Sequence, residues 1–106
     1  MDTSELKKFS DNSFDITVAK KNALERARSR QIVAHNGHLF RADPHTINLA
    51  RTLSDQSGEF YILDVNDNPC LIKDTEEFLN LLIARNQESL NEYHRWYQTL
   101  KNRKSQ

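Results

Sequence analysis

The sequence predicts a small α+β protein in which helices and short β-hairpins alternate along the chain. Three observations support this fold class. Apolar residues recur at helical spacing in the first third, two turn-rich segments each lie between apolar runs, and no glycine or proline follows Pro69. We expect the order helix, β-hairpin, short helix, β-hairpin and long C-terminal helix, with short antiparallel strands covered by helices.

The chain begins with a polar segment of mixed charge. Residues 1–14 surround Phe9 and Phe14 with Ser, Asp, Asn and Lys, without a clear period. We interpret these residues as an N-terminal arm and residues 15–106 as a single domain. The arm either docks through its two phenylalanines or becomes ordered on a partner, so Phe9 and Phe14 are a second candidate contact.

A helical pattern starts at about Asp15. Ile16, Ala19, Ala23 and Ala27 recur at spacings of three and four residues, with basic residues on the other faces. These small side chains would let another helix approach closely.

Turn and capping residues define the next two elements. Asn36 and Gly37 lie between two apolar stretches and predict a hairpin with a type I′ turn, which needs positive φ at both central residues. Asp43 is a favoured N-cap, and Pro44 suits the first helical position because its missing N–H would be unsatisfied there anyway. Gly58 closes this short helix.

A second hairpin and a long helix complete the chain. The apolar runs 60–65 and 69–73 flank a turn-rich trio at 66–68, whose Asx side chains we expect to stabilise a turn. Asp74 with Glu77 three residues later resembles a capping box. A helix from Thr75 to about Arg103 would be about 43 Å long at ~1.5 Å per residue.

The long helix has two different halves. Phe78 to Ile83 is apolar on more than one face, as expected for a segment in the domain's own core. The second half, which protrudes because the helix is longer than so small a body can cover, carries an apolar stripe. We predict that this stripe binds a partner, since exposed Trp and Tyr anchor many interfaces, and the alternative is ordinary packing against the helix that begins near Asp15. Its residues are Leu90, Tyr93, Trp96, Tyr97 and Leu100.

The charge and hydropathy of the sequence argue against binding to nucleic acid or membranes. The 106 residues carry no formal net charge, so no global field attracts nucleic acid or anionic lipid. The N-terminus lacks the apolar region of a signal peptide, and no apolar run approaches the ~20 residues of a membrane span. We expect a soluble protein without membrane contact.

The candidate catalytic and metal-binding residues are isolated in the sequence. We expect the four histidines at solvent-facing positions, since metal sites need further ligands in fixed geometry. Cys70 is the only cysteine and lies in the second predicted hairpin, whereas His35 and His38 lie in the first. We predict that Cys70 is a buried structural residue. We therefore predict no catalytic residues, no metal site, no cofactor and no enzymatic activity.

A basic segment is the one feature that suggests nucleic acid. Lys20 to Arg30 carries five positive charges and one negative charge, whereas residues 54–78 carry seven negative charges and one positive charge. No aromatic residues interleave the basic segment for base stacking. We therefore do not expect nucleic-acid binding, and solvated helix faces complementary to an acidic region are the simpler interpretation.

The order of elements from about Ala19 resembles a domain of unknown function found in tail-fibre, tail-assembly and other tail-associated proteins of tailed bacteriophages. In that domain a charged helix leads into a hairpin reading roughly aromatic-x-Gly-x-x-Phe-x-Ala-Asp, followed by a short helix with a Ser and an Ile-Asn pair. The corresponding residues here are Lys21 to Arg30, Val33 to Asp43, Thr46 at the Ser position, Ile47-Asn48, Phe60 to Pro69, and Thr75 onward.

The resemblance implies a protein of the phage tail that acts by protein–protein contact. The small length favours a tail-fibre or baseplate-associated adaptor, made in the host cytoplasm and located in the virion. Its partners would be other phage tail proteins and itself as a homo-oligomer. Two alternatives remain, a tail-assembly chaperone absent from the virion and a small nucleic-acid-binding regulator.

Overall fold

The computed structural model describes the backbone of residues 3–104 and the side chains of residues 15–102. It confirms the α+β fold and the predicted order of elements. The elements are α1 (Thr3–Ser29), β1 (Ile32–His35), β2 (His38–Arg41), α2 (Pro44–Ser57), β3 (Phe60–Leu63), β4 (Pro69–Ile72) and α3 (Thr75–Lys104).

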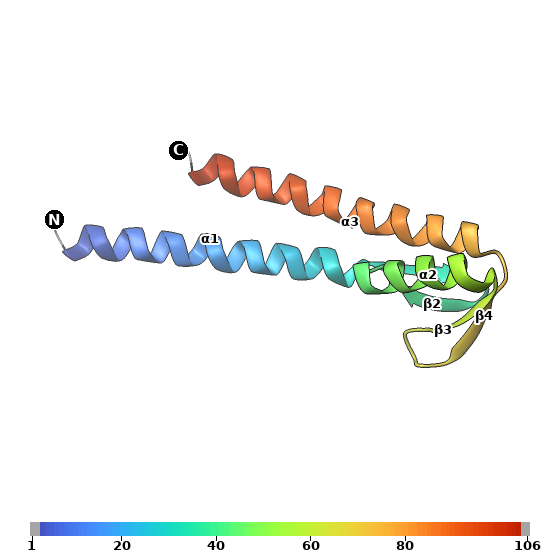
Figure 1. Cartoon of the computed structure of the whole chain (residues 1–106). Helices are drawn as coiled ribbons and strands as arrows, with labels where there is room; N and C mark the ends of the chain where they lie inside the picture. The colour runs from blue at the N-terminus through green and yellow to red at the C-terminus, as the bar shows by residue number, and fades with distance from the viewer. Residues whose placement is uncertain (1–2, 105–106) are drawn as a thin grey trace.

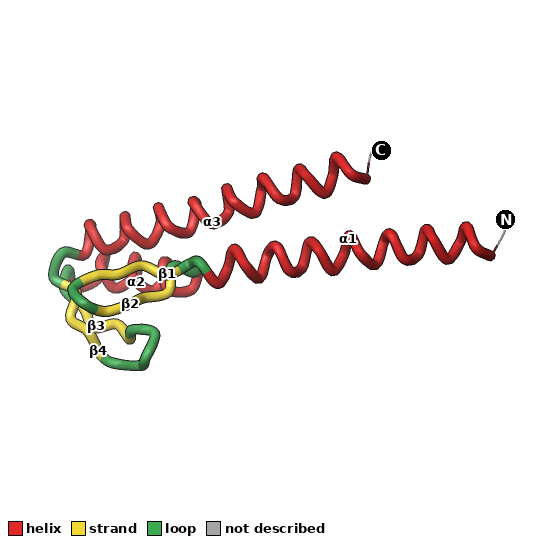
Figure 2. The backbone as a smooth tube through the Cα atoms, turned by 180° about the vertical axis from the view of Figure 1, so that it is seen from behind, coloured by secondary structure: helices red, strands yellow, loops and turns green. Residues whose placement is uncertain are grey.

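The molecule is elongated, with extents of 65 × 24 × 23 Å. Figure 1 shows α2 and both hairpins gathered at one end, which we call the head, against the first turns of α3. The remaining length consists of α1 and α3, which run antiparallel and which we call the shaft, with the N-terminal turns of α1 extending beyond the end of α3. Figure 2, from behind, shows the same pairing, with both ends of the chain far from the head.

The start of α1 corrects one prediction. We expected a separate arm over residues 1–14 and a helix from about Asp15, but one continuous helix begins at Thr3. No glycine or proline occurs before Gly37, so no residue in this segment interrupts a helix. The side chains of Phe9 and Phe14 lie outside the described residues, and their contact stays a prediction.

The two hairpins form separate two-stranded antiparallel sheets. In the first, Val33 pairs with Phe40, and the turn has φ of 51° at Asn36 and 79° at Gly37, as a type I′ turn requires. The second hairpin pairs Leu63 with Pro69 at its turn end. The backbone N–H of Val65 donates to the carbonyl of Leu39 at 2.9 Å and thereby joins the hairpins.

The predicted helix caps are present. The Asp43 carboxylate accepts a hydrogen bond from the N–H of Thr46 at 2.8 Å, and Gly58 ends α2 with φ of 78°. At the start of α3, Asp74 accepts from the N–H of Glu77 at 3.1 Å. The Asp43 and Asp74 carboxylates each satisfy a backbone N–H that has no partner within its helix, and the N–H of Gly58 donates to the carbonyl of Ser54.

Phe78 at the start of α3 is the centre of the core. It is fully buried, and its ring lies 5.0 Å from that of Phe40 and 6.3 Å from that of Phe60, in edge-to-face arrangements. Leu82, one turn later, is also fully buried. The predicted packing of the first half of α3 in the domain core is therefore confirmed for Phe78 and Leu82, whereas Leu81 is 37% exposed.

Buried polar side chains continue the inner face of α3 towards the shaft. Asn86 donates to the carbonyl of Ala42 at 3.0 Å. The Ser89 hydroxyl accepts from the amide of Gln31 at 2.9 Å and donates to the carbonyl of Asn86 at 2.7 Å. These bonds connect α3 to both ends of the first hairpin, where the head meets the shaft.

Candidate functional site

The predicted partner-binding stripe on α3 is partly covered by the chain itself. Leu100 is buried and Tyr93 half-buried, whereas Leu90, Trp96 and Tyr97 remain 40%, 42% and 41% exposed. All five residues lie in the shaft, beside α1. Part of the stripe therefore packs in the shaft, and part of it faces solvent. Its role in binding a partner stays a prediction.

Basic side chains of α1 cover the aromatic rings of the stripe. The guanidinium carbon of Arg26 lies 4.7 Å from the Trp96 ring centroid, and the Lys20 ammonium lies 5.6 Å from that of Tyr97. Both distances fit cation–π contacts. Tyr93 and Tyr97 lie next to each other, with ring centroids 6.4 Å apart.

The basic segment of α1 finds its acidic partner on α3. Arg30 forms an ion pair with Glu92 at 2.7 Å, which lowers the pKa of the Glu92 carboxyl. The Arg85 side chain donates to the carbonyl of Arg30 at 2.7 Å. Part of the basic surface is thus used within the molecule, through a residue that lies outside the acidic region at 54–78.

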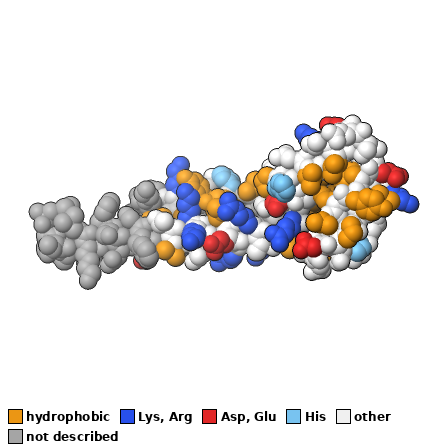
Figure 3. Space-filling model, turned by 60° about the horizontal axis from the view of Figure 1, so that its bottom comes forward, with side chains coloured by type: hydrophobic (Ala, Val, Ile, Leu, Met, Phe, Trp, Pro, Cys, Tyr) orange, Lys and Arg blue, Asp and Glu red, His pale blue; other side chains and the backbone are white. Residues whose placement is uncertain are grey.

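The head carries a second apolar surface, which sequence reasoning missed. We define the head face as Ile32, Leu39, Tyr61 and Leu63, which are 41%, 48%, 67% and 57% exposed. Figure 3 shows hydrophobic side chains gathered over the head and Lys and Arg along the shaft. The unbroken apolar run at 60–63 could have revealed this surface. Successive side chains of a strand point to opposite faces, so an unbroken apolar run places large apolar side chains on the outer face as well.

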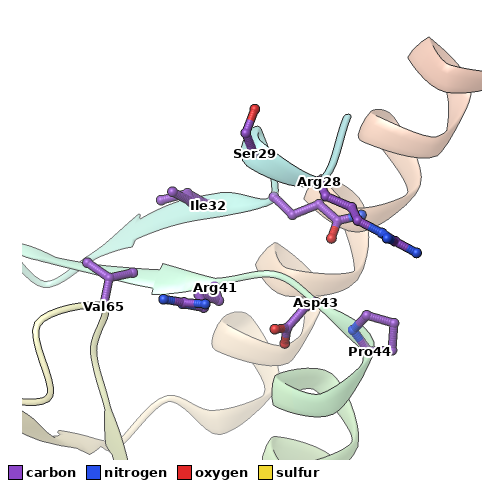
Figure 4. Close-up of a pocket in the computed structure, with 8 residues that line it drawn as sticks. Arg28, Ser29, Ile32, Arg41, Asp43, Pro44 and Val65 are labelled. Carbon is purple, nitrogen blue, oxygen red and sulfur yellow. The ribbon is translucent and has the colours of Figure 1, made fainter. Parts of the chain in front are cut away.

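A hollow of about 490 Å³ lies between the end of α1, the first hairpin and α2. Figure 4 shows Arg28, Arg41 and Asp43 around it. Burial raises the pKa of Asp43, but hydrogen bonds from Thr46 and the charges of His45 and Arg41 outweigh this effect and lower it. The described residues that line the hollow include no aromatic side chain for base stacking.

His35 corrects a further prediction. We expected all four histidines to face solvent, but His35 is only 8% exposed. Its ring lies 5.2 Å from that of Phe78 and 6.5 Å from that of Phe40. The alternation of β1 explains this position, because Val33 and His35 share its inner face. His38, His45 and His94 are exposed as predicted.

Asp64 organises the turn of the second hairpin, as expected for an Asx-stabilised turn. Its Oδ1 accepts hydrogen bonds from the N–H groups of Asn66 and Asn68 at 2.8 and 2.9 Å. Its Oδ2 lies 2.9 Å from Nδ1 of His38 and 3.2 Å from the Asn68 amide. The Asn68 N–H contributes most to lowering the pKa of Asp64 to about 2, and burial opposes this shift.

Cys70 is buried, as predicted, but it is not isolated. Burial, followed by the charge of Asp64, raises the pKa of its thiol, which donates to the carbonyl of Asn68 at 3.5 Å. The ligand atoms of His38, Asp64 and Cys70 all lie within 4.8 Å of one another. We define these three residues as the polar cluster.

The polar cluster was not visible in the sequence. Its members belong to two hairpins, and the sequence predicts each hairpin but not how the two pack together. The type I′ turn that places His38 at the start of β2 was recognisable. The contact between that strand and the turn after β3 was not.

No protein-family model, curated protein or solved structure matches this chain. Among the described helices, none combines the length and apolar character needed to cross a membrane.

Proposed function

We propose that this chain is a non-enzymatic assembly protein of a bacteriophage tail, an adaptor that acts by protein–protein contact. The observation that carries this proposal is the head face. Its large apolar side chains point away from the core, and Tyr61 and Leu63 are more exposed than any residue of the predicted partner-binding stripe on α3. Exposed apolar side chains gathered on one part of a surface are typical of protein interaction sites.

The architecture supports contact as the mode of action. The shaft holds the head at one end of a molecule 65 Å long, so the head face and the predicted partner-binding stripe on α3 are separate surfaces. Two such surfaces on one small protein suit an adaptor that joins two neighbours. The phage-tail setting rests on the sequence resemblance over residues 21–75 and beyond.

The test is mass spectrometry of purified particles and tail intermediates of the phage that encodes the chain. We expect the protein in both, at a fixed ratio to the other tail proteins. Its presence only in intermediates would instead support the chaperone alternative. A purified protein that stays monomeric and is absent from particles and intermediates would overturn the proposal.

Variants identify which surface makes the contact. We expect the double variant Tyr61→Ser, Leu63→Ser to weaken association with the tail by at least ~30-fold, the effect of losing one interface hot spot. Glu59→Ser, an exposed polar position beside β3, is the matched control. Unchanged incorporation of the double variant would exclude the head face.

A further inference from the structure

We propose that His38, Asp64 and Cys70 form a binding site for a single Zn²⁺ ion. This inference goes beyond the proposed function and does not depend on it. It reverses the sequence-based expectation of no metal site, because the expectation rested on the apparent separation of the cysteine from the histidines.

The geometry of the polar cluster supports coordination. One nitrogen, one oxygen and one sulfur atom lie within 4.8 Å of one another, so small side-chain movements bring all three to a central ion. His38 begins β2, Asp64 follows β3, and Cys70 belongs to β4. The ligands therefore come from both hairpins.

The compact triangle fits a metal better than a nucleophile–base pair with an orienting carboxylate. In a catalytic relay the imidazole separates the nucleophile from the carboxylate. Here the thiol sulfur lies within 4.8 Å of the Asp64 carboxylate oxygen and also within 4.8 Å of the imidazole nitrogen. All three ligand atoms therefore lie within reach of one ion.

The donor set selects Zn²⁺. Ca²⁺ and Mg²⁺ prefer oxygen ligands, whereas Zn²⁺ binds Cys sulfur, His nitrogen and Asp oxygen. Binding replaces the proton on the Cys70 thiol, which passes to solvent, and the thiolate and carboxylate together balance the two charges of the ion. Three protein ligands leave the fourth position to water.

Asp64 is already held in the orientation that a ligand needs. Its Oδ1 is fixed by the backbone N–H groups of Asn66 and Asn68, while Oδ2 faces His38. Outer hydrogen bonds that orient a ligand are a regular part of metal sites. The turn thus supplies this support before any ion binds.

Solvent can reach the cluster. The His38 side chain is 44% exposed, in contrast to 2% for Asp64. A hollow of about 240 Å³ is lined in part by His38, Cys70 and Pro69. An ion can therefore reach the imidazole and the thiol from this hollow, and Asp64 Oδ2 lies 2.9 Å from the same imidazole.

The test is titration of the untagged, fully reduced protein with Zn²⁺, and with Co²⁺ as a spectroscopic probe. We expect saturable binding of one ion per chain and a thiolate-to-cobalt charge-transfer absorption that Zn²⁺ removes by competition. The Cys70→Ser variant should lose this absorption. His38→Ala should weaken Zn²⁺ affinity by more than about tenfold, since outer-shell changes alone cost 10- to 100-fold.

His45→Ala is the matched control, because His45 is an exposed histidine at the start of α2 outside the cluster. It should leave the affinity unchanged. Circular dichroism establishes that each variant is folded, and the exposed position of His38 keeps that variant informative if Cys70→Ser unfolds. No saturable binding by the wild type, or equal binding by wild type and His38→Ala, would overturn the proposal.

Discussion

At the scale of single residues, buried polar groups carry much of the specificity of this small fold. Asp64, Asn86, Gln31 and Ser89 are all buried, and each has hydrogen-bond partners. Among the described residues, no buried side-chain nitrogen or oxygen is left without a partner. Because a buried polar group is costly only when it is unpaired, these residues restrict the chain to one arrangement.

Asp64 predicts a specific pH dependence. Its pKa is about 2 in the folded protein, below its usual value of 3.8. The ionised form is therefore favoured by folding, and its contribution is complete above pH 3.8 and lost as the pH falls towards 2. Denaturant midpoints should show the wild type more stable than Asp64→Asn near neutral pH, with the difference shrinking between pH 3.8 and 2.

A difference between these two proteins that stays constant over that pH range would contradict the low pKa. Asp67→Asn is the matched control, because Asp67 lies in the same turn but is exposed. Its effect on the midpoint should be small across the range.

Asn86 predicts a cost in stability at the junction of head and shaft. Replacement by Ala removes the donor to the Ala42 carbonyl, which lies on a buried residue. We expect Asn86→Ala to lower the free energy of unfolding by about 1–3 kcal/mol. Urea denaturation measures this change, and Asn91→Ala at an exposed position of the same helix should cost much less.

At the scale of elements, local turn chemistry determines where helices and strands begin and end. Gly37 has φ of 79° and open space around its absent Cβ, so only backbone conformation opposes a side chain there. We expect Gly37→Ala to lower the free energy of unfolding by about 1–2 kcal/mol. Gly37→Asn should cost less, since Asn tolerates positive φ, and equal losses for the two variants would contradict this explanation.

The sequence could predict those features that depend on a few neighbouring residues. The turn at Asn36-Gly37, the cap at Asp43-Pro44 and the stop at Gly58 each depend on a few adjacent residues, and all three were predicted correctly. The start of the first helix was predicted too late in the chain because a polar helix without a clear apolar period looks irregular in the sequence. The inward position of His35 and the polar cluster depend on contacts between elements, which periodicity does not report.

At the scale of the whole molecule, the shaft depends on close approach of its two helices. Ala23 and Ala27 on α1 are 3% and 4% exposed, as their small size and spacing led us to expect. A larger side chain there would push α3 away. We expect Ala23→Leu to lower the free energy of unfolding by about 1–3 kcal/mol, the usual cost of overpacking.

Thermal denaturation with Asn22→Leu as the control tests this prediction. Asn22 is exposed on the same helix, so the control adds the same side chain without crowding α3. Equal melting temperatures for the two variants would show that the helices do not pack at Ala23.

The antiparallel shaft also determines how the molecule responds to mechanical force. The N-terminal end of α1 and the C-terminal end of α3 both point away from the head, and α1 extends beyond α3 (Figure 1). A pull applied between them therefore separates α1 from α3 one turn at a time, like a zipper, instead of shearing all their contacts together. The cation–π pairs of Lys20 and Arg26 would break before the Arg30–Glu92 ion pair, and the head would be loaded last.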